Sequence, residues 1–364
     1  VAIAAMPVRM VAMRVIHWFR NDLRLRDNSA LAWAASQANE VLPVFVLDRR
    51  LLRQSKPRDA FLIDCLERLA ADLEKRGSRL VLLEGRPERE IPKLAKAIDA
   101  QHVTCNRDTT PFSLRRDADV EAALKRSDIA FSTHKDRVIR ESDEIRTQEG
   151  KPYAVYTPYR NRWWERFRED PPADPPRLHL PPAPSGVDSK PMPAQPTLPR
   201  DFELVGGGEA AAVRRLDTFV SSALGDYAAQ RDLPAVDGTS RLSPHLRFGT
   251  ISVRRCIQAA LELAAAEPRS EESAKKWADE LVWREFYAAI LQEHTRVLHE
   301  PYRHAYQALV WDDAPDHLAA WADGETGYPF VDAAMRQLKQ TGWMHNRARM
   351  VVASFLTKDL NIDW

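Results

Sequence analysis

The chain has 364 residues, of which 44% are hydrophobic and 29% are charged, and its formal net charge is +1. These values indicate a soluble globular protein with a sizeable core, and two domains are the natural expectation at this length. The balanced charge excludes a whole-molecule field that attracts nucleic acid or membrane, so any polyanion site has to be a local patch. No apolar run approaches the length of a membrane span.

The three cysteines are scattered, odd in number and without metal-type spacing, and they are Cys65, Cys105 and Cys256. This pattern predicts small buried hydrophobes in a reducing cytoplasm. Residues 1–12 are mildly apolar, but the uncharged run is short and Arg9 interrupts it. We therefore predict no signal peptide and expect ordered structure to begin near Met13.

From Arg14 to about Arg140, short apolar runs alternate with amphipathic segments. Buried strands are predicted at 15–19, 40–47, 79–85 and 102–106. Helices are predicted at 59–77, where Gly77 is expected as a C-cap, and at 88–100 and 116–126. Strands that alternate with helices predict a parallel, doubly wound sheet.

A glycine-rich dinucleotide fingerprint is missing after the first strand. The segment "WFRNDLRLRDNSAL" (18–31) stands there instead, and its polar residues crowd the carboxyl end of the strand. Open α/β sheets usually bind ligands at that end. An ordinary salt-bridged loop is the alternative, and both interpretations stay open.

The composition then changes twice. Between Pro171 and Pro199, 11 of 29 residues are proline, which predicts an extended connector. After Arg200 the pattern is helical almost throughout. The predicted helices lie at 211–231, 252–266, 273–295, 328–340 and 345–360.

Tryptophan is concentrated at the end of the chain. Six of the ten lie in the last 88 residues: Trp277, Trp283, Trp311, Trp321, Trp343 and Trp364. Core packing explains a single helical tryptophan, but six interleaved with arginine suit a large planar ligand or unstacked bases.

Helical spacing places candidate groups on common faces. Trp277, Glu280 and Arg284 share one face, and Glu280, Trp283 and Tyr287 share an overlapping one. A carboxylate flanked by tryptophans can hydrogen-bond the edge of a stacked heterocycle. The alternative is a Glu280–Arg284 pair, which stabilises a helix by only about 0.2–0.5 kcal/mol.

Two further segments carry polar groups that suit ligands. In "WMHNRARM", Asn346 borders a cationic strip and lies one turn from Met350. Near residue 240, the hydroxyls of Thr239, Ser240 and Ser243 cluster at a helix start, where they suit phosphate. An ordinary N-cap is the alternative there.

These motifs together resemble the photolyase/cryptochrome family of blue-light flavoproteins. The segment "WFRNDLRLRDNSAL" is followed in family order by "RDLPAVDGTSRLSPHLRFG", "WADELVWREFYAAIL", "GETGYPFVDAAMRQL" and "TGWMHNRARMVVASFLTKDL". The resemblance runs from about Met13 to the last residue, and it is greatest to the class I members that repair cyclobutane pyrimidine dimers.

The resemblance implies an α/β domain over 13–140, a linker over 141–205 and a helical FAD- and DNA-binding domain over 206–364. The first domain would be Rossmann-like and hold an antenna chromophore, either methenyltetrahydrofolate or a deazaflavin. The helical domain would hold FAD. By matching positions, the FAD pocket would comprise Tyr227, Thr239, Ser240, Leu242, Ser243, Trp277, Arg284, Asn346 and Arg349.

The same resemblance implies light-driven repair of UV-damaged DNA. A dimer flipped out of the duplex would meet Glu280, Trp283, Asn346, Arg347 and Met350, with Arg231 as a neighbouring DNA contact. Members specific for (6-4) lesions are disfavoured, because they use a histidine where this chain has Met344–His345–Asn346. Two alternatives remain: a cryptochrome-type photoreceptor, disfavoured by the presence of Trp283 and Met350, and a DNA-binding module without catalysis.

In the family, tryptophans carry electrons from the surface to the flavin. Trp311 matches the outermost position and Trp364 the middle one. The innermost position would lie beyond the last residue, so the sequence is expected to be an incomplete FAD domain that binds FAD weakly or not at all. A monomer in the cytoplasm is expected.

Overall fold

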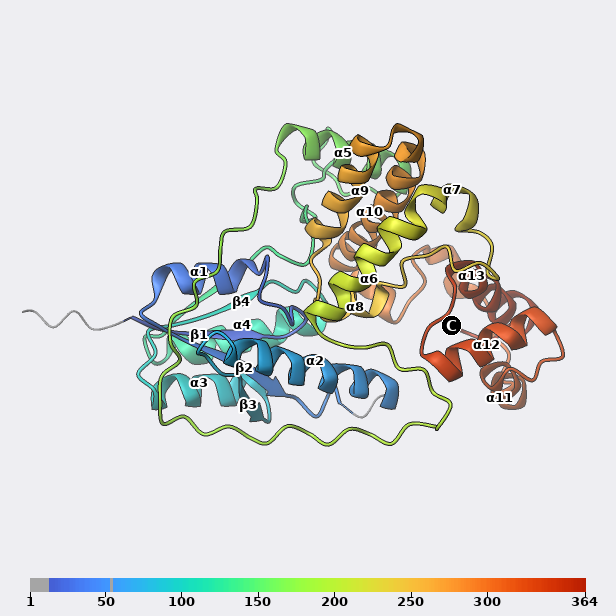
Figure 1. The fold of residues 1–364 in the computed structure, drawn as a ribbon. Helices are drawn as coiled ribbons and strands as arrows, with labels where there is room; N and C mark the ends of the chain where they lie inside the picture. Colours follow the sequence, from blue (N-terminus) through green and yellow to red (C-terminus); the bar gives the residue numbers. More distant parts are fainter. Residues whose placement is uncertain (1–12, 53–54) are drawn as a thin grey trace, which may run out of the picture.

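A computed structural model describes residues 13–52 and 55–364; the segment 1–12, for which no signal peptide was predicted, lies outside these residues. As predicted, an α/β half precedes a helical half (Figure 1). No helix among the described residues is long and apolar enough to cross a membrane.

The α/β half is built on a parallel sheet in the order β3-β2-β1-β4-β5. Its strands are β1 (Arg14–Phe19), β2 (Glu40–Leu47), β3 (Val81–Glu84), β4 (His102–Asn106) and β5 (Ala130–His134). The first four confirm the predicted strands. The pattern did not predict β5, because this edge strand is only half-buried and its sequence AFSTH lacks a continuous apolar run.

Helices cover both faces of the sheet. On one face, α1 (Ser29–Gln37) and α2 (Lys56–Glu74) share a core with β1 and β2. On the other, α3 (Pro87–Ala97) and α4 (Pro111–Lys125) pack on β1, β2 and β4. Gly77 follows the end of α2 with φ +71°, the left-handed conformation expected near a helix C-terminus. The three cysteines are buried and free, as predicted.

The proline-rich connector is extended, as predicted, and it runs along the α/β half before returning to the helices (Figure 1). It covers the edge strand β3. The main-chain N–H of Lys190 donates to the carbonyl of Leu82 at 2.8 Å, and the Leu82 N–H donates to the hydroxyl of Ser189 at 3.0 Å. The connector therefore protects an open sheet edge.

The range expected as a linker, 141–205, contains a helix, α5 (Tyr156–Glu169). Its apolar stripe of Tyr156, Tyr159, Trp163 and Phe167 has helical spacing, but four arginines dilute the pattern. Tyr159 and Trp163 are almost fully buried in the core of the helical half. This part of the expected linker is therefore structural.

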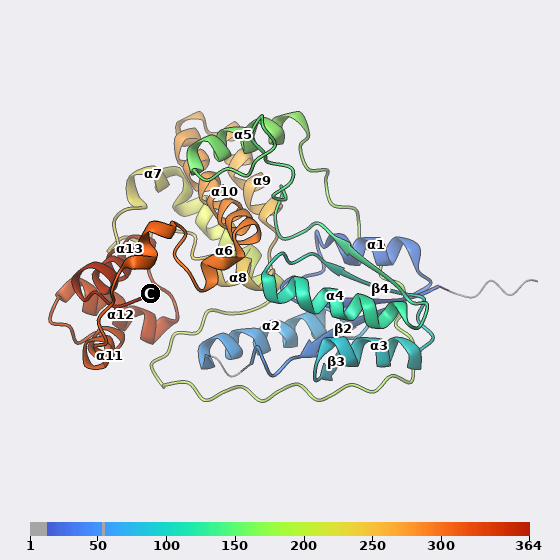
Figure 2. The ribbon, with the colours of Figure 1, turned by 180° about the vertical axis from the view of Figure 1, so that it is seen from behind.

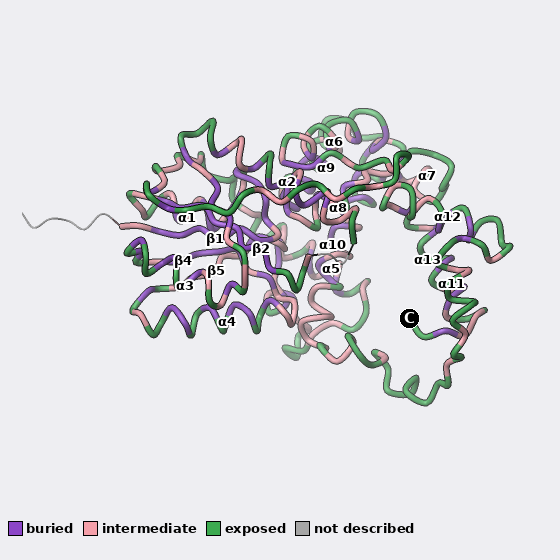
Figure 3. Tube along the Cα trace, turned by 90° about the horizontal axis from the view of Figure 1, so that it is seen from below, coloured by how far each residue is buried: buried purple, intermediate pink, exposed green. Residues whose placement is uncertain are grey.

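The helical half has two cores. One is formed with α5 by α6 (Glu209–Ser222), α7 (Tyr227–Gln230), α8 (Ser243–Phe248), α9 (Val253–Ala266) and α10 (Glu271–Glu293). The other is formed by α12 (Pro329–Thr341) and α13 (Asn346–Ser354), with α11 (Pro315–Asp323) against them. Figure 2 shows this second group beside α7, and Figure 3 shows the exposed segment that leads to it from α10.

The segment 18–31 of the α/β half makes contacts with the helical half. Leu23 N–H donates to the Phe248 carbonyl at 3.1 Å, and the Arg24 guanidinium donates to the Gly249 carbonyl at 3.0 Å. Arg24 also pairs with the buried Asp136 at 2.6 Å. The interpretation as a salt-bridged loop therefore holds for this part of the segment.

Candidate functional site

Four charged side chains from three elements meet beside α7. Arg231, which follows α7, pairs with Glu280 of α10 at 2.6 Å. The neighbouring Asp232 pairs with Arg347 of α13 at 2.6 Å, and its carboxylate lies 3.6 Å from Arg231 Nε. Arg347 Nη1 also lies 3.6 Å from the sulfur of Met350. This charged cluster joins the two cores of the helical half.

The charges of the cluster support one another. The hydrogen bond from Arg347 lowers the pKa of Asp232 below its ordinary value. Burial alone would lower the pKa of Arg231, but Tyr227 and the carboxylate of Glu280 hold it above its ordinary value. Arg231 therefore stays cationic. Because the side chains of Asp232 and Arg347 are exposed to solvent, a phosphate can compete for Arg347.

Aromatic rings border the cluster. Trp283 of α10 lies flat on Tyr156 of α5, with ring centroids 3.4 Å apart and planes 9° from parallel. Tyr287 stacks against Trp283 at 5.5 Å. On the other side, the Arg231 guanidinium lies 5.4 Å from the ring centre of Tyr227. The predicted combination of flat rings beside guanidinium groups is therefore present.

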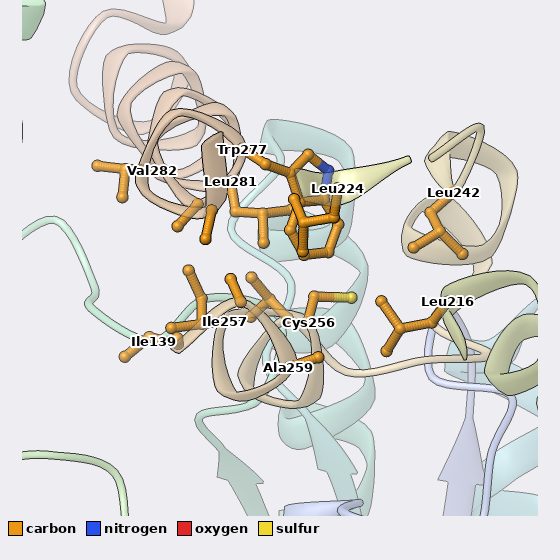
Figure 4. Close-up of a cluster of buried hydrophobic side chains, with 14 of the residues drawn as sticks. Ile139, Leu216, Leu224, Leu242, Cys256, Ile257, Ala259, Trp277, Leu281 and Val282 are labelled. Carbon is orange, nitrogen blue, oxygen red and sulfur yellow. The ribbon is translucent and has the colours of Figure 1, made fainter. Parts of the chain in front are cut away.

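Three residues expected in the FAD pocket share a core. Tyr227, Leu242 and Trp277 are buried together, and Phe219 contacts both Tyr227 and Trp277. In Figure 4 the indole nitrogen of Trp277 points to the side on which Leu242 lies. Within the described part of the chain, this indole N–H has no hydrogen-bond acceptor, so it remains available as a donor.

The three expected phosphate-binding hydroxyls lie at the start of α8. Ser243 is the first residue of α8 and is exposed, while Thr239 and Ser240 are half-buried. No described residue hydrogen-bonds the hydroxyl of Thr239 or Ser243. The alternative of an ordinary side-chain N-cap does not hold, because Leu242 occupies the N-cap position.

Three other expected FAD residues lie apart from this group. Arg284 donates to the main-chain oxygens of Arg137 and Leu246, so its guanidinium lies between the α/β half and α8. Burial and the nearby Arg137 lower its pKa to about 10. Asn346 and Arg349 are exposed at the start of α13, and no hydrogen bond or ion pair within the described residues joins them to Tyr227 or Trp277.

The predicted electron-transfer residues Trp311 and Trp364 lie side by side. Their ring centroids are 5.4 Å apart and their planes are nearly perpendicular. The main-chain N–H of Asp312 donates to the Asn361 carbonyl at 2.8 Å, which holds the two segments together. Trp364 is exposed and Trp311 is half-buried.

Two residues at the site were missed in the sequence. Asp232 directly follows Arg231, and the alternating charge of this pair beside a helix end was the available signal. Tyr156 lies in the range expected as a linker, and only its place in the apolar stripe of α5 marked it. Neither position indicates by itself a contact with α13 or α10.

A cavity of about 290 Å³ opens at the carboxyl ends of β1 and β2 in the α/β half. Its lining includes Trp18, Phe45, Phe112, Asp48 and Arg116, and the Arg116 guanidinium lies 4.8 Å from the ring centre of Trp18. Aromatic walls with charged edges suit a flat polar ligand. The segment 18–31 therefore contributes its first residues to a cavity and its later residues to salt bridges.

The fold and the site define a two-part protein, in which an α/β half precedes a helical half with an aromatic and arginine-rich site. Comparisons with known proteins agree. Residues 15–177 match the DNA photolyase domain, and residues 277–364 match the FAD binding domain of DNA photolyase. A Synechococcus protein named deoxyribodipyrimidine photo-lyase is 41% identical over 97% of this chain and 76% of its own length. The chain therefore belongs to the photolyase/cryptochrome family.

Two solved structures extend the comparison. A bacterial class III photolyase from Agrobacterium tumefaciens has a TM-score of 0.89 and 34% identity, covering 100% of this chain and 76% of its own. The cryptochrome of Synechocystis has a TM-score of 0.88 and 29% identity, covering 98% and 77%. This chain thus spans about three quarters of the length of these three relatives.

Proposed function

We propose that this protein repairs cyclobutane pyrimidine dimers in DNA, driven by blue light, with FAD as its cofactor. The observation that carries the proposal is the charged cluster beside Trp283. It gathers Glu280, Arg231 and Arg347 from three elements, and Met350 lies beside Arg347. By the resemblance, Glu280, Arg347 and Met350 match the lesion site of the family, and Arg231 matches a neighbouring DNA contact. The name of the Synechococcus relative supports the same substrate.

The residues present fit FAD at two points. The indole N–H of Trp277 is a free donor beside the buried Tyr227, and the open hydroxyls of Thr239 and Ser243 suit a pyrophosphate. When bound, reduced and excited FAD would supply the electron for splitting the dimer, and that electron would return to the FAD afterwards. We infer that the helical half from residue 206 holds this group.

The chain's own residues bind and orient the lesion. Arg231 and Arg347 hold DNA through its phosphates, which makes the affinity salt-dependent. A dimer flipped from the duplex stacks on Trp283 and contacts Met350. The Glu280 carboxyl accepts a hydrogen bond from the polar edge of the bases, and the ion pair with Arg231 fixes the direction in which it points.

An antenna chromophore is proposed for the cavity at the carboxyl ends of β1 and β2. Its aromatic walls and the cationic edge at Arg116 suit a planar, polar heterocycle. A folate and a deazaflavin both meet this description. Absorption spectra of the protein reconstituted with each one distinguish them.

The test is a repair assay on an oligonucleotide that carries one cyclobutane dimer. The purified protein is loaded with FAD, reduced and illuminated at blue wavelengths, with a dark sample as the control. We expect the base absorbance that is lost when the dimer forms to return only in the illuminated sample. A protein that retains FAD but leaves the dimer intact in the light would contradict the proposal.

A cryptochrome-type photoreceptor is the second candidate, and similarity to the Synechocystis cryptochrome favours it. The two candidates differ in what light does to DNA. A photoreceptor would show light-dependent flavin reduction without repair. The presence of both Trp283 and Met350 beside the charged cluster supports repair.

A further inference from the structure

Tyr156 covers one face of the Trp283 ring. The 3.4 Å centroid distance and the 9° angle describe a face-to-face stack between α5 and α10. Among the residues that the structure describes, Trp283 has two other aromatic neighbours, Phe286 and Tyr287, and both come from its own helix. Tyr156 is thus the ring that a separate element brings to Trp283 within the described residues.

Tyr156 is itself held in place at its far end. Its hydroxyl donates to the main-chain oxygen of Asp279 at 2.7 Å. The side chain of Asp279 accepts from the indole of Trp164 at 2.7 Å, and it pairs with Arg160 at 3.4 Å. Each of these bonds joins α5 to α10, so the ring plane of Tyr156 is set by the packing of two helices.

The α5 helix is fixed by a second, deeper anchor. The indole N–H of Trp163 donates to the buried carboxylate of Glu285 at 2.6 Å. Glu285 lies two residues after Trp283 on α10. This bond therefore holds α5 against the turn of α10 that carries Trp283. The Tyr156 ring on α5 is therefore a rigid support for the Trp283 ring on α10.

We propose that Tyr156 is a positioning residue that holds the Trp283 ring in the orientation needed to stack the flipped dimer, an inference that rests on the proposed function. Without this stack, Trp283 rotates into the space that Tyr156 leaves, and its plane is no longer fixed beside Glu280. Stacking of a base on an aromatic side chain depends on that plane. The loss of affinity is expected for damaged DNA only, because undamaged duplex DNA is proposed to contact the phosphate-binding arginines and not Trp283.

The experiment compares binding of dimer-containing and undamaged oligonucleotides in the dark by fluorescence anisotropy. Tyr156→Leu is expected to raise the Kd for damaged DNA about tenfold and to leave the Kd for undamaged DNA within twofold. Tyr156→Phe loses the bond to Asp279 but keeps the stacked ring, and the bonds of Trp163 and Trp164 still hold α5 on α10, so it is expected to bind nearly as the unsubstituted protein does. Tyr153→Leu is the matched control, because Tyr153 packs in the same core but contacts Tyr159 instead.

A double substitution shows whether Tyr156 acts through Trp283. Adding Tyr156→Leu to Trp283→Leu is expected to cause no further loss of affinity for damaged DNA. A further tenfold loss in that background, or an equal loss for damaged and undamaged DNA, would overturn the inference. If Tyr156→Leu does not fold, as judged by thermal unfolding, Tyr156→Met keeps the buried volume without a planar ring and serves in its place.

The failure of this inference is distinct from the failure of the proposed function. An unsubstituted protein that prefers damaged DNA, together with a Tyr156→Leu variant that binds equally well, refutes only the role of Tyr156. An unsubstituted protein without any preference for damaged DNA refutes the proposed function, and the inference falls with it.

Discussion

The Nη1 atom of Arg231 lies 2.6 Å from a carboxylate oxygen of Glu280, which ties the end of α7 to the middle of α10. Both side chains are partly exposed, so the pair contributes only about 0–1 kcal/mol to the free energy of unfolding. Substitutions at this pair therefore report on binding and repair with little change in stability.

Arg231→Ala is expected to weaken binding of both damaged and undamaged DNA, because Arg231 is proposed to hold a phosphate. The slope of log K against log salt concentration should become shallower by about 1. Anisotropy titrations at several salt concentrations measure the slope. Arg269→Ala, which removes an exposed arginine between α9 and α10, is the control. An unchanged slope in Arg231→Ala would remove Arg231 from the DNA interface.

Glu285 is a buried carboxylate whose loss is expected to destabilise the fold. It accepts from the main-chain N–H groups of Ile139 and Arg140 at 2.5 and 3.1 Å, and from the Trp163 indole at 2.6 Å. Glu285→Ala leaves these donors unpaired and should cost about 3 kcal/mol or more. Glu285→Gln keeps an acceptor oxygen and should cost less. Urea denaturation measures both variants, and equal costs would show that the hydrogen bonds contribute little.

Gly249 allows the two halves to approach closely. Its φ is +66°, and a Cβ at this position would overlap the main-chain oxygen of Asn21. Gly249→Ala is expected to destabilise the protein by more than about 2 kcal/mol, through strain and overlap together. Gly327→Ala is the matched control, because its φ is +82° but nothing lies within 4 Å of a Cβ there. Thermal unfolding should show a much larger shift for Gly249→Ala, and similar shifts would refute the overlap.

His17 is expected to make stability pH-dependent. Burial, with the nearby Arg20 and His134, lowers its pKa to about 3 despite the opposing charge of Asp136. The unfolded chain, with an ordinary histidine pKa of about 6.5, therefore takes up a proton that the folded protein refuses. Stability is present above pH 6.5 and is lost as the pH falls toward 3, by about 1.4 kcal/mol per pH unit from this residue.

His17→Leu should reduce that slope by the same amount. Urea denaturation between pH 4 and pH 7 measures it. The carboxylate of Asp22 lies 3.9 Å from the His17 ring, so its own titration can also change the stability in this pH range. Its pKa is raised by burial, so its titration is followed in the same series with Asp22→Asn. An unchanged slope in His17→Leu would show that His17 does not carry the effect.

The hydrophobic pattern of the sequence predicted those strands whose side chains are mostly buried. Buried strands are rich in apolar residues, and β1 to β4 were found for that reason. The edge strand β5 and the helix α5 were missed, because half-buried and arginine-rich segments give weak patterns. Proline content predicted the extended connector, but not that it covers the edge of β3.

For the site, helical spacing determined which residues of one helix share a face, since that depends on local geometry alone. It placed Glu280 with Trp283 but left open whether Glu280 faces Arg284 or a group elsewhere. Only the tertiary structure decided that its partner is Arg231, that Arg284 lies between the α/β half and α8, and that Tyr156 lies on Trp283. These contacts join residues far apart in the chain, and their partners are set by how the helices pack, which no local pattern encodes.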